Sequence, residues 1–246
     1  MFLGTAALPI IGTACATPAS SKPTTPTSAP ARGSGAATSS YAKTSMTPDE
    51  VLAMLKQGNA KYVAGAPLPP PDDRKRRLEI AQTQLPVAAY VSCSDSRVPP
   101  ELLFGRGLGD LFIIRNAGNT VDTIAMGSIE FAVAELGVPL VVVMGHERCG
   151  AVKAAVAVVE KNARFPGSIG KMIEPIIPAV LRARAAPGDL LENSVRENVR
   201  SVTTQLRTAA EPMLLDPQRA GKLKVIGAYY DLDTGAVDFF DEHAHG

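Results

Sequence analysis

Tryptophan is absent from this 246-residue chain, and cysteine and histidine are scarce, with three residues of each. Three cysteines are too few to stabilise a chain of this length by disulfides, which excludes a disulfide-stabilised scaffold. Charge of neither sign is in excess, because 25 lysines and arginines balance 24 acidic residues and leave a net charge of +1. The sequence therefore lacks both a strongly basic surface and a polybasic membrane patch, and no nucleic-acid partner is expected.

Acidic residues are also missing from the N-terminal part of the chain, where the first is Asp49. Residues 1–16 carry no charge and end in small residues around Cys15. This stretch is shorter than the roughly 20 apolar residues of a membrane-spanning helix, and it resembles an export signal with its cleavage site. Residues 17–46 consist almost entirely of Thr, Ser, Pro, Ala and Gly, which predicts a disordered linker.

A second pattern overlaps the end of the signal-like segment. Residues 11–15, IGTAC, resemble a bacterial lipobox, with Gly12 where leucine is usual. This pattern predicts lipidation of Cys15 and membrane attachment through the N-terminus. The expected location is the periplasm or cell envelope. The alternative interpretation is an apolar tail on a cytoplasmic protein.

The remaining residues, 47–246, are expected to fold as one domain, since the chain is 46% apolar and can bury a core. Thr47 and Glu50 form a capping box around Pro48, which predicts a helix of about 17 residues that ends near Gly65. The charged segment 72–77 leads into a short second helix. Short apolar runs are typical of strands buried on both faces of a parallel sheet, and they occur at 87–91, 111–114, 140–143 and 225–229.

Helix-length segments separate these runs, at 120–136, 151–161 and 169–210. The segment 120–136 is apolar nearly all round, which predicts a buried helix. An amphipathic stripe begins after Asp189, a predicted N-cap, and consists of Leu191, Val195, Val199, Val202 and Leu206. The alternation predicts an α/β fold with a mostly parallel central sheet flanked by helices, an N-terminal helical arm and a last edge strand at 236–240.

Two motifs directly follow predicted strands. CSDSR occupies residues 93–97, and HERCG occupies residues 146–150. Ligands of open α/β sheets bind beyond the carboxyl ends of the strands, so Cys93, His146 and Cys149 are expected to converge there. Two thiolates and an imidazole suit zinc and leave its fourth tetrahedral position open. The alternative is a pair of buried apolar cysteines, or a disulfide.

These motifs, with RNAGNTV at 115–121 and GSIEFAV at 127–133, resemble the β-class carbonic anhydrases from residue 47 to about residue 240. The resemblance implies a catalytic domain that assembles as homodimers or multiples of dimers, with the N-terminal helix reaching onto the partner subunit. It implies one Zn2+ per chain on Cys93, His146 and Cys149. The expected reaction is reversible hydration of CO2 to bicarbonate and a proton by zinc-bound hydroxide.

The resemblance also assigns catalytic roles to Asp95 and Arg97. The arginine holds the carboxylate off the metal, and the carboxylate orients the attacking oxygen. In some members this aspartate leaves its arginine and closes the site, and a tryptophan lines the bicarbonate pocket of that subgroup. Since tryptophan is absent here, the open form is expected. Two thiolates make the metal less electropositive than three histidines do, which predicts a bound-water pKa above roughly 7.

Two further residues are weaker candidates for substrate binding. Gln84 lies nine residues before Cys93, where plant-type members have a glutamine that binds substrate, and Gly118 belongs to a loop that approaches the pocket. Gly118 reads equally well as a turn glycine with positive φ. The two middle residues of HERC are assigned no role. The alternatives for function are hydrolysis of carbonyl sulfide or carbon disulfide by the same site, or a non-catalytic zinc-binding protein.

Overall fold

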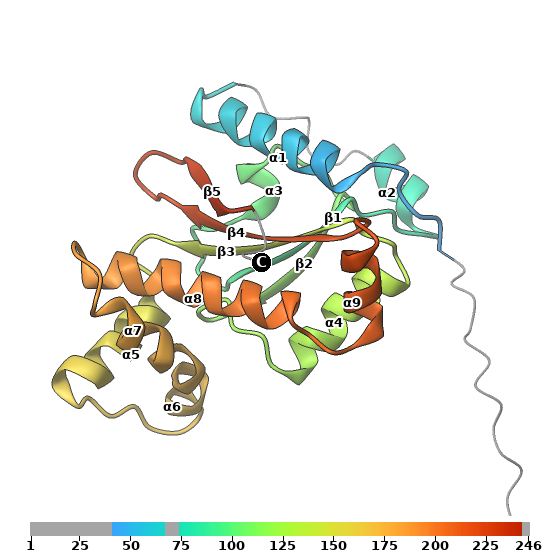
Figure 1. Cartoon of the computed structure of the whole chain (residues 1–246). Helices are drawn as coiled ribbons and strands as arrows, with labels where there is room; N and C mark the ends of the chain where they lie inside the picture. The colour runs from blue at the N-terminus through green and yellow to red at the C-terminus, as the bar shows by residue number, and fades with distance from the viewer. Residues whose placement is uncertain (1–40, 67–73, 243–246) are drawn as a thin grey trace, which may run out of the picture. The chain divides into compact units, whose positions relative to one another are not determined.

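The computed structural model describes residues 41–66 and 74–242, which belong to one compact unit (Figure 1). The signal-like segment with Cys15, and the linker as far as residue 40, lie outside the described residues, as does the start of the charged segment at 72–73. Within the described part of the chain, no helix combines the length and the apolar character needed to cross a bilayer.

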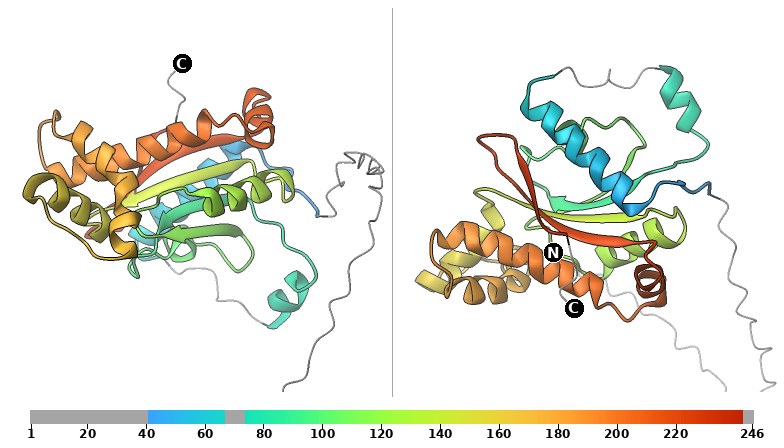
Figure 2. Two further views of the ribbon diagram at one scale, coloured as in Figure 1. Left: turned by 90° about the horizontal axis from the view of Figure 1, so that it is seen from below. Right: turned by 45° about the horizontal axis from the view of Figure 1, so that its top comes forward.

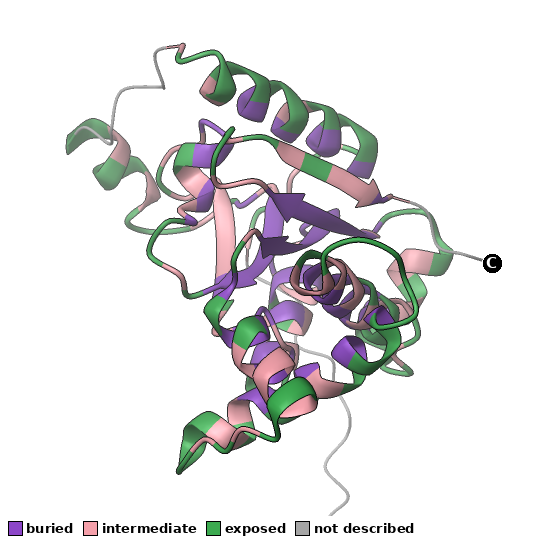
Figure 3. Cartoon of the chain, turned by 90° about the vertical axis from the view of Figure 1, so that its left-hand side faces the viewer, coloured by how far each residue is buried: buried purple, intermediate pink, exposed green. Residues whose placement is uncertain are grey.

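A five-stranded sheet forms the centre, in the order β2-β1-β3-β4-β5. Its strands are β1 (Ala88–Cys93), β2 (Leu111–Asn116), β3 (Leu140–His146), β4 (Lys224–Tyr230) and β5 (Val237–Asp241). The first four run parallel, and β5 pairs antiparallel with β4 at the edge. Every residue of β1 and β3 is buried, as the apolar runs predicted (Figure 3). The same prediction was wrong for β2, where only Ile114 is buried, because β2 lies at the edge of the sheet. The predicted fold class is confirmed.

Helices cover both faces of this sheet (Figures 1 and 2). One face carries α1 (Pro48–Val63) and α3 (Pro100–Leu103), with α2 (Arg74–Ile80) nearby. The other carries α4 (Thr123–Ala134), α5 (Gly150–Lys161), α6 (Ser168–Ile173), α7 (Ile177–Ala183), α8 (Leu190–Arg207) and α9 (Pro212–Arg219), with a 3-10 turn at Glu174–Ile176. Alternate β1 residues therefore enter two different cores, Tyr90 beneath α1 and Val91 beneath α4 and α8.

The predicted capping box opens α1. The Glu50 amide donates to Thr47 Oγ1, and the Thr47 amide donates to Glu50 Oε2. Val51 and Leu55 of this helix are completely buried in the core that also holds Tyr90. The apolar face of α1 thus covers the chain's own sheet, and its predicted contact with a partner subunit stays a prediction.

One helix differs from the prediction. The segment 120–136 was expected to be buried all round, but α4 leaves Ile124 78% exposed and Phe131 38% exposed. The prediction was wrong because α4 packs beside β2, the edge strand, and only one helix face meets the chain's own core. The short helices α3 and α9 were not predicted. Both begin at a proline, whose fixed φ suits the first turn of a helix.

Candidate metal centre

The residues of the two motifs meet where β1 and β3 end. These strands are neighbours and run parallel, so their carboxyl ends lie at the same edge of the sheet. Cys93 is the last residue of β1, and His146 is the last residue of β3. Cys149 follows as the N-cap of α5. The topology therefore places all three side chains together, as the spacing of the motifs predicted.

Their potential ligand atoms form a tight group. The two sulfurs and a ring nitrogen of His146 all lie within 4.8 Å of one another. The sulfurs of Cys93 and Cys149 are 3.8 Å apart, and both cysteines are free. All three residues are buried, with His146 completely inaccessible. This is the donor set that binds zinc with one coordination position left open.

The hydrogen bonds of His146 leave one nitrogen for a metal. Its Nδ1 lies 2.9 Å from the backbone oxygen of Glu147, a carbonyl that can only accept, so Nδ1 carries the proton. Its Nε2 is buried and has no hydrogen-bond partner among the residues that the structure describes. A buried polar atom without a partner needs an explanation, and a metal bond supplies it. The residues present therefore fit a zinc ion.

The two cysteine sulfurs are linked by a hydrogen bond. This bond, with a weaker one from the Gly118 amide, lowers the pKa of Cys93 to about 4 against the effect of burial. The pKa of Cys149 is raised, first by that same hydrogen bond and then by burial. The local hydrogen bonds thus favour a thiolate on Cys93, the form in which cysteine binds a metal.

Asp95 and Arg97 lie beside this group. The Arg97 guanidinium donates from Nε to Asp95 Oδ1 at 2.9 Å and from Nη2 to Asp95 Oδ2 at 2.8 Å. These hydrogen bonds hold the pKa of the Asp95 carboxyl well below its usual range. Asp95 Oδ2 lies 3.9 Å from His146 Nε2, so the carboxylate borders the same space as the ligand atoms. An ionised hydrogen-bond acceptor is thus fixed next to the reaction centre.

A residue outside the two motifs holds the loop that carries Asp95. Arg115 donates from Nε to the backbone oxygen of Cys93 at 2.9 Å and from Nη2 to that of Asp95. The sequence predicted no separate role for Arg115, which is the first residue of the RNAGNTV motif. The register of the parallel pair explains its place, because Arg115 lies opposite Ser92 at the end of β1.

Both descriptions of Gly118 apply. Its amide donates to the Cys93 sulfur at 3.4 Å, so the loop does approach the centre. Its φ is +78°, and a Cβ there would lie 2.5 Å from Ile176 Cδ1, so a side chain would strain the backbone and force Ile176 to move. Asn198 of α8 holds the loop from behind by donating to the Gly118 backbone oxygen at 2.8 Å.

Gln84 lies elsewhere. It precedes the amino end of β1, whereas Cys93 stands at the carboxyl end. The length of the strand, about 17 Å for five steps of 3.3 Å, separates the two ends. Within one chain, Gln84 is therefore not among the residues around the metal centre.

Comparison with known proteins agrees with this site. Residues 88–237 match the family model described as carbonic anhydrase. A carbonic anhydrase of Mycolicibacterium smegmatis is 38% identical over 184 residues, which cover 75% of this chain and 89% of that protein. A β-carbonic anhydrase structure of Aspergillus fumigatus matches with a TM-score of 0.60 and 26% identity, over 80% of this chain and 91% of that one. One of the tetrameric β-carbonic anhydrases of Sordaria macrospora gives the same score and identity, over 66% and 84% of the two chains.

Proposed function

The chain belongs to the β-class carbonic anhydrases, zinc lyases that hydrate CO2, and on this premise we propose that Cys93, His146 and Cys149 hold the metal in a site whose resting form is open. The observation that carries the proposal is the convergence of two sulfurs with a buried, unpartnered imidazole nitrogen. Zinc bound there would supply a Lewis acid that makes water nucleophilic near neutral pH.

The chain's own residues do the rest. Asp95 is an acceptor of fixed direction, because Arg97 occupies both of its oxygens and the Arg97 amide also donates to Oδ1 at 3.0 Å. Such a carboxylate can accept a hydrogen bond from the attacking oxygen and so turn a lone pair of that oxygen toward CO2. Arg115 and the Gly118 amide keep Cys93 and the Asp95 loop in place.

The intact Asp95–Arg97 pair supports the open form. In a closed site the carboxylate would have to leave two charge-assisted hydrogen bonds to bind the metal. The absence of tryptophan from the sequence points the same way.

Stopped-flow CO2 hydration, with zinc content measured on the same sample, tests this function. Activity with about one zinc per chain is the expected result. Full zinc content with no hydration at pH 7 or pH 8.5 would contradict it and favour a sulfur-containing substrate or a closed site.

Assembly as a homodimer is part of the proposal, with the edge strand β2 at the contact between the two subunits. Among the described residues β2 pairs only with β1, and Leu111, Phe112 and Ile113 remain partly exposed along it. The exposed Phe131 of α4 extends this apolar area, since its ring lies 6.2 Å from that of Phe112. An apolar edge strand with unpaired backbone groups is a surface that a second copy can cover.

Sedimentation velocity tests the dimer. Ile124→Lys places a charge in the exposed apolar face of α4 and should raise the dimer dissociation constant at least tenfold. Leu181→Lys is the matched control, because Leu181 is also exposed, at 52%, but lies on α7. Equal dissociation constants for the two variants would contradict this interface.

Within one chain, β1 separates Gln84 from the metal centre. Gln84 therefore takes part in substrate binding only in a dimer, where it could reach the metal centre of the other chain. Gln84→Ala should then raise KM for CO2 with little change in zinc content. Mixed dimers of Gln84→Ala chains and Asp95→Asn chains decide the point. In such a dimer the intact Asp95 belongs to one chain and the intact Gln84 to the other. If Gln84 acts on the site of the other subunit, the two residues therefore serve the same site, and the dimer keeps the wild-type KM.

Export to the periplasm or cell envelope is the last part of the proposal, supported by the uncharged residues 1–16 and the linker-like composition of residues 17–46. Lipid attachment at Cys15 is its finer form. Cell fractionation with a Cys15→Ser variant tests both. Release of the variant from the membrane supports lipidation, and a wild-type chain found in the cytoplasm contradicts export.

A further inference from the structure

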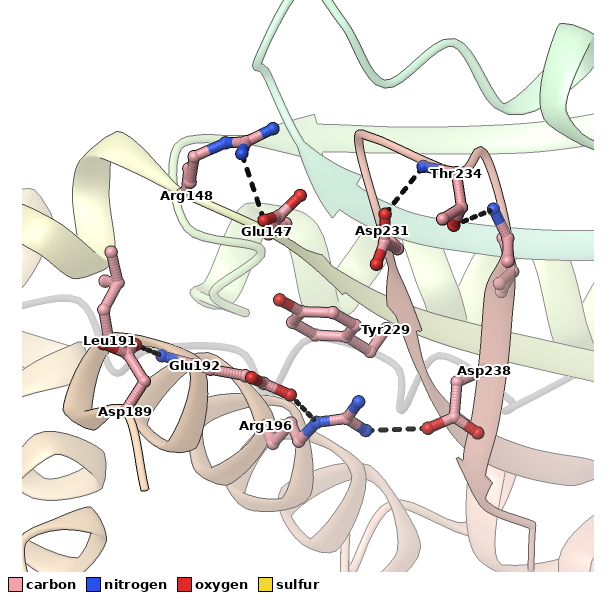
Figure 4. A pocket seen from close by; sticks show the side chains of 12 residues that line it. Glu147, Arg148, Asp189, Leu191, Glu192, Arg196, Tyr229, Asp231, Thr234 and Asp238 are labelled. Carbon is pink, nitrogen blue, oxygen red and sulfur yellow. Dashed lines mark hydrogen bonds and ion pairs between the residues drawn. The ribbon is translucent and has the colours of Figure 1, made fainter.

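The two middle residues of the HERC motif lie against the turn between β4 and β5. Residues 146–149 are called the ligand loop here, and residues 231–235 the hairpin turn. Figure 4 shows both at the rim of a cavity of about 540 Å3, with Glu147 and Arg148 on one side and Asp231 and Thr234 on the other. The side chains of both Glu147 and Arg148 contact residues of the hairpin turn.

Glu147 connects the end of β4 to the imidazole of His146. Its amide donates to the backbone oxygen of Tyr230 at 2.8 Å, and its carboxylate accepts from the Leu232 amide at 3.1 Å. Its own carbonyl accepts the Nδ1 proton of His146 at 2.9 Å. A displacement of Glu147 would therefore turn the ring whose other nitrogen faces the metal site.

Arg148 connects the same loop to the tip of the turn. Its guanidinium donates to both oxygens of Asp233, at 3.0 and 2.5 Å. Its backbone φ is +52°, a left-handed conformation that residues other than glycine rarely adopt. This conformation reverses the chain between His146 and Cys149, so that both face one point.

The hairpin turn is itself anchored, without help from the ligand loop. Asp231 accepts from the amides of Asp233 and Thr234. The buried Asn59 of α1 donates to the backbone oxygen of Gly235 at 2.9 Å and accepts from the Val237 amide at 2.8 Å. These hydrogen bonds fix the turn to α1, which lies on the face of the sheet opposite to α5.

We infer that Glu147 and Arg148 are positioning residues for zinc, which fix the ligand loop on the hairpin turn and so set the distance between His146 and Cys149. The inference rests on the proposed zinc site. Asp233 is 68% exposed and Arg148 49% exposed, and exposed ion pairs contribute little to overall stability. Loss of the pair should therefore weaken metal retention far more than folding, since partners of metal ligands affect metal affinity 10- to 100-fold.

The experiment measures the rate of zinc release to a chromophoric chelator, the absorption spectrum of the cobalt-substituted protein, and Tm. Asp233→Asn removes the charge and one of the two acceptor oxygens that face Arg148, and it changes no residue of the ligand loop, whose Arg148–Glu147 contact at 3.2 Å remains. Its matched control is Asp238→Asn, which removes the Arg196–Asp238 pair of 2.8 Å at the same cavity, with Asp238 57% exposed (Figure 4). Asp233→Asn should release zinc about tenfold faster and alter the cobalt spectrum, whereas Asp238→Asn should stay within twofold of wild type.

Variants of the loop separate the backbone from the side chain. Arg148→Gly tolerates the positive φ but also loses the contact of Arg148 with Glu147 at 3.2 Å, so it should release zinc at least as fast as Asp233→Asn. Arg148→Ala loses the same contacts and keeps the backbone strain that Arg148 already carries, so it should release zinc faster than Arg148→Gly. Glu147→Gln keeps an acceptor for the Leu232 amide and should restore most of the retention that Glu147→Ala loses.

Equal zinc release from Asp233→Asn and Asp238→Asn would overturn the inference, and so would equal release from Glu147→Gln and Glu147→Ala. A wild-type protein that binds zinc without hydrating CO2 would refute the proposed function instead. The release rates and cobalt spectra would still test the positioning role in that case.

Discussion

The guanidinium of Arg97 donates to both carboxylate oxygens of Asp95, at 2.9 and 2.8 Å, while one of those oxygens lies 3.9 Å from His146 Nε2. The arginine therefore decides which way the carboxylate faces and keeps it ionised. A bidentate contact of this kind fixes direction as well as charge, which a lysine cannot do.

Substitution of Arg97 tests this relationship. Arg97→Ala should lower kcat for CO2 hydration by about 100-fold, because Asp95 loses its fixed direction beside the ligand atoms. Arg97→Lys should recover only a part, since an ammonium group makes one directed contact in place of two. Stopped-flow rates normalised to zinc content provide the measurement. Rates within threefold of wild type for Arg97→Ala would show that the pair has no catalytic role.

The pH dependence of the rate should not come from Asp95. Hydrogen bonds from Arg97 lower the pKa of Asp95 well below its usual value, so the carboxylate stays ionised between pH 5 and pH 9. A lowered carboxyl pKa adds stability above the unfolded pKa of roughly 3.9 and loses it as pH falls further. Any loss of rate between pH 9 and pH 6 therefore belongs to the metal centre.

The profile of kcat against pH checks this in wild type and in Asp95→Asn. Both should show a midpoint, above roughly pH 7 in wild type and shifted in the variant by the loss of the neighbouring negative charge, with a lower plateau for the variant. A wild-type profile already flat at pH 6.5 would contradict the expected effect of two thiolate ligands. A flat profile in Asp95→Asn would contradict the assignment to the metal centre.

The sequence could predict those parts of the site that depend on neighbouring residues in the chain, but not those that depend on contacts between residues far apart in it. The strand ends at Cys93 and His146 were predictable because apolar runs stop there, and the parallel topology then brings the side chains together. The contact of Arg148 with Asp233, 85 residues away, has no local signal, so no role was assigned to Arg148. The same limit applies to Arg115, whose acceptors are backbone oxygens of a neighbouring strand end.

Helix α4 shows a different limit. Its apolar composition predicted burial all round, but in the structure only one face of the helix is buried, by Ala125, Ile129, Ala132 and Val133. Ile124 is 78% exposed within the single chain, although its side chain is as apolar as that of the fully buried Ile129. An apolar pattern alone therefore does not decide which residues of a helix the chain itself covers.

Removal of the metal should expose the Cys93–Cys149 pair to oxidation. The sulfurs lie 3.8 Å apart, and the pKa of Cys93, lowered to about 4 mainly by its hydrogen bond from Cys149, provides a thiolate at neutral pH. With oxidised glutathione as the oxidant, Cys93 displaces one glutathione thiol and Cys149 then displaces the other, which leaves an intrachain disulfide. Zinc on both sulfurs should block the first step.

Mass spectrometry after chelation checks this prediction in a Cys15→Ser chain, which has no third thiol. The apo protein should lose two hydrogens and fail to recover activity when zinc is added, until a reductant is present. The zinc-loaded protein should remain unchanged under the same conditions. Equal oxidation of both forms would mean that the metal does not lie on these sulfurs.

A buried ion pair at the sheet edge should govern stability without affecting the chemistry. Arg207 of α8 donates to both oxygens of Asp241 on β5, at 2.9 and 3.1 Å, and the two side chains are only 11% and 5% exposed. Thr203 donates to the same carboxylate at 2.9 Å. Asp241→Ala would leave the Arg207 charge buried without its partner, a change that costs about 3–5 kcal/mol.

Urea unfolding of the zinc-loaded protein measures this cost. The pair Arg196–Asp238, in which Asp238 is 57% exposed and Arg196 23%, serves as the reference, since loss of the more exposed partner in Asp238→Asn should cost only about 0–1 kcal/mol. Asp241→Ala should retain kcat at low temperature, because Asp241 lies on β5, two strands away from β3, which carries His146, and three away from β1, which carries Cys93. Loss of kcat in a folded, zinc-loaded Asp241→Ala protein would instead mean that the edge strand acts on the ligand loop through the hairpin turn. In that case the variant should also release zinc faster, as Asp233→Asn does.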